Sequence, residues 1–125
     1  MWSVNILIVE DESIVAWDLK ERLELMGHNV VDSVRSGEEA LKIVEKVKVD
    51  LIFMDIRLAG ALDGIETAIQ IKNNFNVSII YISANSDFTT RNEIKQTKPY
   101  QYLIKPFDDF ELQIAINNCL ITISY

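Results

Sequence analysis

The stretch Ile6-Leu7-Ile8-Val9-Glu10-Asp11 joins a short apolar run directly to a pair of acidic residues. Three later apolar runs also stop at a residue with reactive chemistry: residues 51–54 stop at Asp55, residues 79–82 at Ser83 and residues 102–104 at Lys105. If these runs are strands of one parallel sheet, their carboxyl ends meet at one edge, where open α/β sheets bind ligands. Three carboxylates, a hydroxyl and an ammonium at that edge predict a site for a divalent cation and phosphate.

Strands and helices are predicted to alternate along the whole chain. The predicted strands cover residues 4–9, 30–34, 51–54, 77–82 and 101–104. The predicted helices cover residues 13–26, a segment opened by an S-x-x-E capping box at residues 36–39, residues 65–73, residues 88–96 and a last segment capped by Asp108. This (βα)5 pattern predicts an α/β, flavodoxin-like fold: a doubly wound sheet of five parallel strands in the order 2-1-3-4-5. That order places Asp11 beside Asp55.

Composition limits the classes of protein to which the chain can belong. Its 125 residues, nearly half of them apolar, predict one globular domain over residues 1–125. The net charge of −7 argues against nucleic-acid binding by this domain. No apolar run approaches the roughly 18 residues of a membrane span, so no membrane association is expected. Cys119 is the single cysteine, which excludes an internal disulfide and favours a cytoplasmic location.

Five short motifs occur in an order and at spacings that resemble the receiver domain of two-component response regulators. They are residues 6–12, ending in Glu10-Asp11-Glu12, then Met54-Asp55-Ile56, Asp63-Gly64, Ile82-Ser83-Ala84 and residues 102–107, which contain Lys105-Pro106. Each motif alone is weakly specific, but the resemblance covers essentially the whole chain. It implies a signalling domain that takes a phosphoryl group from a histidine kinase or phosphotransfer protein and changes conformation to regulate an output partner.

The resemblance also implies roles for the reactive residues. Asp55 is expected to be the phosphoacceptor, and Lys105 to contact the phosphoryl group. Glu10 and Asp11, with Asp55 and the backbone carbonyl of Arg57, are expected to hold Mg²⁺, with Mn²⁺ as an alternative ion. Elementary chemistry agrees, because Mg²⁺ prefers carboxylate and carbonyl oxygens and a carboxylate can act as a nucleophile toward phosphorus. Such a domain is not an enzyme beyond its own phosphotransfer and slow autodephosphorylation.

The same resemblance implies which residues would connect the phosphorylation site to a partner surface. Ser83 and Tyr102 are expected to form a switch pair, and the Lys105-Pro106 peptide bond is expected to be cis. The last helix carries a second apolar stripe at Phe110, Ile114 and Ile121, which is either additional buried surface or a partner surface for a homodimer.

Three other classes of function are weaker alternatives. A receiver-like module that binds proteins but takes no phosphate would not need the complete set of Glu10, Asp11, Asp55, Ser83 and Lys105. An aspartate-nucleophile phosphatase would have an acid two residues after the nucleophile, where this chain has Arg57. A flavin-binding domain is also disfavoured, because the acids after the first strand would repel a phosphate.

Four remaining predictions concern single positions. The loop after Asp55 is one residue longer than is usual in the family, and Ala59 stands where proline is common, so the loop is expected to be less rigid. His28 is predicted to be a solvated turn residue and Cys119 a small core residue. Trp17 lies off the apolar stripe of its helix, where it either covers the sheet edge or anchors a partner.

Overall fold

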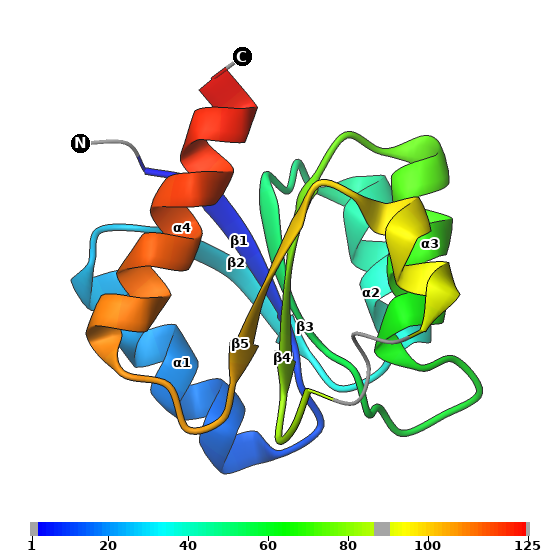
Figure 1. Ribbon diagram of the computed structural model, residues 1–125, viewed down its shortest axis with the longest axis horizontal. Coiled ribbons are helices and arrows are strands. Elements are labelled where there is room, and N and C mark those ends of the chain that lie inside the picture. Colours follow the sequence, from blue (N-terminus) through cyan, green and yellow to red (C-terminus); the bar gives the residue numbers. More distant parts are fainter. Residues whose placement is uncertain (1–2, 87–90, 125) are drawn as a thin grey trace.

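Five strands form one parallel sheet in the computed structural model, which describes residues 3–86 and 91–124 (Figure 1). The strands are β1 (Asn5–Val9), β2 (Asn29–Val34), β3 (Leu51–Asp55), β4 (Ser78–Ser83) and β5 (Tyr100–Ile104). Their order is β2-β1-β3-β4-β5, and every neighbouring pair is parallel. The predicted order of the doubly wound sheet is therefore confirmed.

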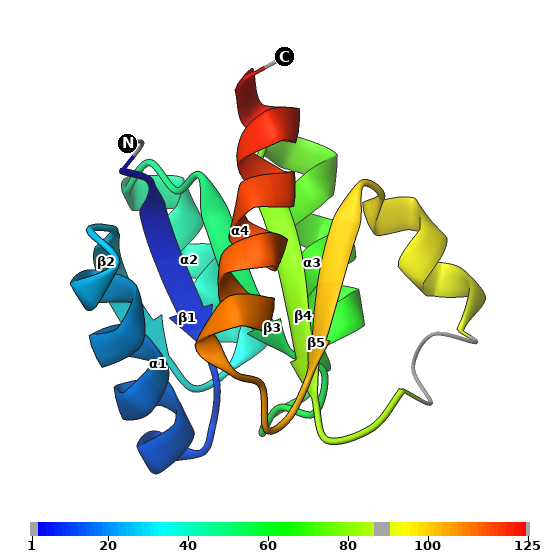
Figure 2. The ribbon, with the colours of Figure 1, turned by 60° about the vertical axis from the view of Figure 1, so that its left-hand side comes forward.

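Helices cover both faces of this sheet, as Figures 1 and 2 show. One face carries α1 (Ser13–Leu25) and α4 (Asp109–Ser124), and the other carries α2 (Gly37–Lys46), α3 (Gly64–Asn74) and the 3₁₀-helix η2 (Asn92–Thr97). Alternate strand residues belong to the two resulting cores: Leu7 and Ile52 face α2 and α3, whereas Ile8 and Phe53 face α1 and α4. Because β3 is covered on both faces, all of its residues are buried, as its continuous apolar run predicts. Cys119 of α4 is buried in the second core, as expected.

Side-chain caps fix where three helices begin. Asp108 accepts a hydrogen bond from the backbone N–H of Glu111, whose carboxylate accepts one from the Asp108 N–H, so α4 has a full capping box. Ser36 caps α2 as predicted, but Glu39 accepts from the N–H of Arg35 instead of closing the box on Ser36. A capping box that the sequence interpretation missed, Asp63 with Glu66, begins α3 directly beside the acidic edge of the sheet.

The fourth connection differs from the predicted helix over residues 88–96. Residues 87–90 lie outside the described ranges, and the described part contains the short 3₁₀-helix η2. Its polar sequence offers Ile94 as the one apolar anchor. The Thr97 hydroxyl donates to the Ile94 carbonyl at 2.7 Å and accepts from the buried Tyr81 hydroxyl at 2.7 Å. These contacts favour tight i→i+3 bonding in this segment over a longer α-helix.

His28 is buried, so the prediction of a solvated turn residue is wrong. The chain reverses at Gly27, which has φ 93°, and the N–H of His28 then donates to the Leu23 carbonyl at 3.1 Å. This reversal folds the imidazole inward and leaves it 6% exposed. Burial lowers the pKa of His28. Within the described ranges, no helix combines the length and the apolar character that crossing a membrane would need.

Candidate functional site

Three carboxylates meet at the carboxyl edge of the sheet, at the ends of the adjacent strands β1 and β3. One possible ligand oxygen each from Glu10, Asp11 and Asp55 lies within 4.8 Å of the other two. The strands pair in register up to Val9 and Met54, so the acids that follow them are brought together by the sheet itself. Glu10 is 1% and Asp55 4% exposed, whereas Asp11 is half-buried. The donor set consists of hard oxygen ligands, which fits Mg²⁺ and not a thiolate-preferring metal.

Backbone N–H groups orient two of these carboxylates. The Glu12 N–H donates to Glu10 Oε2 at 3.0 Å, and the Arg57 N–H donates to Asp55 Oδ1 at 3.0 Å. Among the described residues, the buried Glu10 Oε1 accepts no hydrogen bond of good geometry, although it takes part in an ion pair. Burial, together with a hydrogen bond to Asp55, raises the pKa of Glu10. A buried carboxylate with spare oxygen capacity suits a cation-binding position.

Lys105 brings the positive charge of the site. Its Nζ lies 2.7 Å from Glu10 Oε1, 3.5 Å from Asp55 Oδ2 and 3.5 Å from Glu12 Oε1, and its side chain is 17% exposed. Burial alone would lower the pKa of Lys105, but its bond to Glu10 and the charges of the acids raise it overall. The contact between Lys105 and Glu12 was not predicted, although Glu12 directly follows the acidic pair Glu10-Asp11 in the sequence. The Lys105-Pro106 bond is cis as predicted; Lys98-Pro99, which was not singled out, is cis as well.

The two expected switch residues differ in exposure. Ser83 ends β4 next to β3, is 7% exposed and accepts a hydrogen bond from the Asn85 N–H at 3.4 Å. Tyr102 lies on the edge strand β5, in register with Tyr81, and is 49% exposed. The structure therefore places the hydroxyl of Ser83 near the acidic edge and the ring of Tyr102 at the surface.

The loop after Asp55 is held against α2. Ser36 and Ala59 form an isolated parallel β-bridge, and Glu38 accepts a hydrogen bond from the Ala61 N–H at 3.2 Å. Between them Gly60 has φ 100°, a conformation that side chains other than glycine rarely adopt. The expectation of a less rigid loop rested on the loop's extra residue and absent proline and did not include these contacts, which tie the loop to a neighbouring helix.

A second ion pair near the site was also missed. Arg91 Nη1 lies 2.7 Å from Asp63 Oδ2, and this pair raises the pKa of Arg91. Both residues line a hollow of about 420 Å³ together with Arg57, Ser83 and Asn85. Because 28 positions separate the two partners, no local pattern in the sequence could have linked them.

The chain matches the family described as the response regulator receiver domain over residues 6–117. It is 33% identical over 119 residues to the phyllosphere-induced regulator PhyR of Methylorubrum extorquens, covering 94% of this chain and 44% of that protein. It is 32% identical over 112 residues to the transcriptional regulatory protein PdtaR of Mycobacterium tuberculosis, covering 90% and 54%. The chain thus spans about half the length of these curated relatives.

Solved structures share the fold and include an example with a bound metal. The signal receiver domain of a modulated diguanylate cyclase from Desulfovibrio desulfuricans is 34% identical, with a TM-score of 0.88 and coverage of 97% of this chain and 96% of that one. The receiver domain of a sensor histidine kinase from Pseudomonas aeruginosa, described with a magnesium ion in its active-site cleft, is 32% identical, with a TM-score of 0.81 and coverage of 94% and 97%. Because the family match extends from residue 6 to residue 117 and these relatives share its fold, the chain belongs to the receiver domains of two-component response regulators.

Proposed function

We propose that this chain is a phosphorelay switch in which Asp55 accepts a phosphoryl group from the phosphohistidine of a histidine kinase or phosphotransfer protein. The observation that carries the proposal is the meeting of Glu10, Asp11 and Asp55, with ligand oxygens within 4.8 Å of one another, beside Lys105 Nζ at 3.5 Å from Asp55. The domain catalyses only its own phosphotransfer and slow autodephosphorylation. It acts in the cytoplasm, in keeping with its single, buried cysteine.

Glu10, Asp11, Asp55 and the backbone carbonyl of Arg57 would hold Mg²⁺, with Mn²⁺ as an ion of similar ligand preference. The burial of Glu10, with its ligand oxygen within 4.8 Å of those of Asp11 and Asp55, supports this assignment. These residues would hold the cation where it would neutralise charge on the acids and on the phosphoryl oxygens. Without it, three carboxylates face the single ammonium of Lys105.

In the transfer, a carboxylate oxygen of Asp55 forms a bond to phosphorus while the bond from phosphorus to the donor's imidazole nitrogen breaks. The electron pair of the broken bond stays with the imidazole. The Arg57 N–H, which donates to Asp55 Oδ1, fixes the orientation of the carboxylate during attack. Lys105 supplies a positive charge on the side of Asp55 Oδ2, where it stabilises negative charge on the transferring group.

Phosphorylation would reach the surface through Ser83 and Tyr102. Ser83 is buried next to the strand that carries Asp55, while Tyr102 is half-exposed on the edge strand. A hydroxyl drawn toward the new phosphoryl oxygens would change the packing next to β5 and shift an existing equilibrium between two positions of the Tyr102 ring. Phe110 is 73% and Ile114 43% exposed on α4, so this face offers an apolar surface for an output partner or a second copy of the chain.

Mass spectrometry after incubation with acetyl phosphate and Mg²⁺ tests the proposal. The wild type is expected to gain one phosphate, and Asp55→Asn or omission of the metal is expected to abolish the gain. Asp32→Asn, a change at an exposed aspartate of β2, serves as the matched control and is expected to label like the wild type. Equal labelling of Asp55→Asn and Asp32→Asn would remove Asp55 from the acceptor role.

A further inference from the structure

We propose that Arg22 of α1 is a positioning residue for Lys105, because it fastens the turn that carries this lysine to the neighbouring helices. The inference rests on the proposed function, in which the Lys105 ammonium faces the phosphoryl group on Asp55. Arg22 belongs to none of the sequence motifs of the site. Its guanidinium donates a hydrogen bond to the turn at Phe107, two residues after Lys105.

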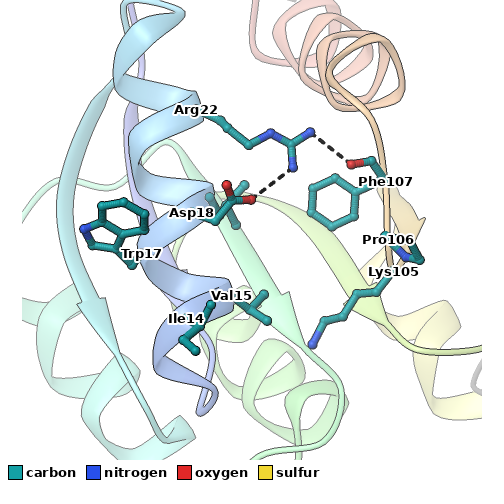
Figure 3. A pocket seen from close by; sticks show the side chains of 9 residues that line it. Ile14, Val15, Trp17, Asp18, Arg22, Lys105, Pro106 and Phe107 are labelled. Atoms are coloured by element: carbon teal, nitrogen blue, oxygen red, sulfur yellow. Dashed lines mark hydrogen bonds and ion pairs between the residues drawn. The ribbon is translucent and has the colours of Figure 1, made fainter.

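The guanidinium of Arg22 makes contacts in several directions at once (Figure 3). Its Nη2 donates to the Phe107 carbonyl at 3.0 Å, and its Nε donates to Asp109 Oδ1 at the start of α4 at 2.7 Å. Its central carbon lies 5.1 Å from the centre of the Phe107 ring, within the range of a cation–π contact. A longer ion pair to Asp18, at 3.4 Å, holds the side chain along its own helix. One residue thus joins α1, the turn and α4.

The turn is anchored on both sides of Lys105. On its strand side, the Lys105 N–H donates to the Ser83 carbonyl at 2.7 Å. On its helix side, the Phe107 carbonyl accepts from Arg22. Between these two anchors the Lys105 side chain extends to Glu10 and Asp55. Loss of the second anchor would leave the helix side of the turn held by the packing of Phe107 and the Asp108 cap alone, so the position of the ammonium over Asp55 would be less restricted.

An arginine is needed here because its acceptors lie in different directions. A planar guanidinium presents several N–H donors in a fixed fork and stacks on a ring, whereas an ammonium is a compact point charge. Lysine could retain the pair with Asp109 but not the bond to Phe107 and the stacking together. The carboxylates of Asp18 and Asp109 are 60% and 73% exposed, so these ion pairs contribute little to the free energy of unfolding. The contribution of Arg22 is therefore mainly geometric.

The experiment compares Arg22→Met and Arg22→Lys with Lys20→Met, which removes a positive charge from an exposed position of the same helix. Acetyl phosphate is the donor, because it reaches Asp55 without a protein partner that could contact α1. At saturating Mg²⁺, Arg22→Met is expected to slow phosphorylation about tenfold, since small misplacements of a catalytic group cost this much or more. Arg22→Lys is expected to slow it roughly threefold, because part of the anchor remains. Lys20→Met is expected to match the wild type.

A double-mutant cycle distinguishes positioning from a general loss of structure. In a Lys105→Met background, Arg22→Met is expected to cause no additional loss, because the group that it positions is gone. The Mg²⁺ affinity measured by calorimetry is expected to be unchanged by Arg22→Met, since the acidic cluster keeps its contacts. Equal rates for Arg22→Met and Lys20→Met, a further loss in the Lys105→Met background, or a matching fall in Mg²⁺ affinity would each overturn the inference.

A second measurement does not depend on phosphorylation. The NMR signal of the Lys105 side-chain ammonium is expected to shift in Arg22→Met and to stay unchanged in Lys20→Met. If the wild type takes up no phosphate, the proposed function fails, and this shift still decides whether Arg22 positions Lys105. An unshifted Lys105 signal in Arg22→Met would overturn the inference even if phosphorylation of the wild type proceeds normally.

Discussion

Strands β3 and β5 belong to the same sheet but have very different surroundings. Strand β3 pairs with β1 on one side and β4 on the other, and all five of its residues are buried. Among the residues that the structure describes, strand β5 pairs with β4 alone, and Leu103 is the single buried residue of the strand. The proposed phosphoacceptor Asp55 thus ends a strand that is buried along its whole length, whereas the expected switch residue Tyr102 lies on an edge strand.

This difference fits the separate roles that we propose for Asp55 as phosphoacceptor and Tyr102 as switch residue. A phosphoacceptor must stay aligned with the cation and Lys105, and packing on both faces restricts the motion of Asp55. A switch residue must have two positions of similar free energy, which a half-exposed edge strand permits more readily than a close-packed one. Three experiments test whether the enclosed and the edge strands of this sheet differ in this way.

The largest effect is expected from truncating buried and exposed rings in the two strands. Phe53 of β3 is fully buried, and Phe53→Ala is expected to lower the free energy of unfolding by about 3–5 kcal/mol. Tyr102 of β5 is half-exposed, and Tyr102→Ala is expected to lower it by about 0.5 kcal/mol. Urea denaturation of both variants gives the comparison. Losses of similar size would mean that the two strands are equally important to the fold.

The second test concerns the face next to β5. If phosphorylation turns this face into a dimer surface, Ile114→Glu is expected to weaken dimerisation in the presence of beryllofluoride by roughly tenfold or more, because it buries a charge in an apolar interface. Sedimentation measures the effect, with Ile14→Glu on the exposed side of α1 as the control. If beryllofluoride leaves the wild type monomeric and amide exchange over residues 100–121 unchanged, phosphorylation does not turn the face next to β5 into a dimer surface.

The smallest effect concerns β2, the edge strand on the other side of the sheet. His28 precedes β2, is buried and is the single histidine of the chain. Burial lowers its pKa in the folded state below the ordinary value of 6.5, so the unfolded chain binds more protons as pH falls below 6.5. Stability that is present above this pH is therefore lost below it.

Denaturation of the wild type and His28→Asn between pH 7.5 and pH 5.5, on the order of one unit on each side of the unperturbed histidine pKa, isolates this contribution. The wild type is expected to lose more stability than the variant on acidification, since other titrating groups are shared and cancel. Parallel stability curves for the two proteins would show that His28 does not contribute to the pH dependence.

The strands and the acidic cluster were predictable because their signals are local. An apolar run that stops at Asp55 carries both the strand and the position of the reactive group in one short stretch. The sheet then brings such stretches together in a way that parallel topology largely dictates. The capping residues Ser36 and Asp108 were also visible from a few neighbouring positions.

Features that depend on distant partners were not predictable in this way. The burial of His28 depends on how the chain packs after Gly27, and η2 depends on the bond between Thr97 and Tyr81 of another element. Arg22 and Asp109 lie 87 positions apart, so their contact becomes visible only in three dimensions. The interaction that we propose to set the position of Lys105 therefore leaves no motif in the sequence.

The contact between the loop after β3 and α2 has a consequence for how this domain could tolerate change. The N–H of Arg57 is fixed on Asp55, while Ala59 and Ala61 are exposed and held by Ser36 and Glu38 farther along the loop. The part of the loop at residues 59–61 is thus exposed and is held by contacts separate from those that fix the first two positions after Asp55. Insertions or a spectroscopic label placed at Ala61 would lengthen or mark this exposed part of the loop and leave the spacing between Asp55 and Arg57 intact, which makes it a suitable attachment point for reporter groups.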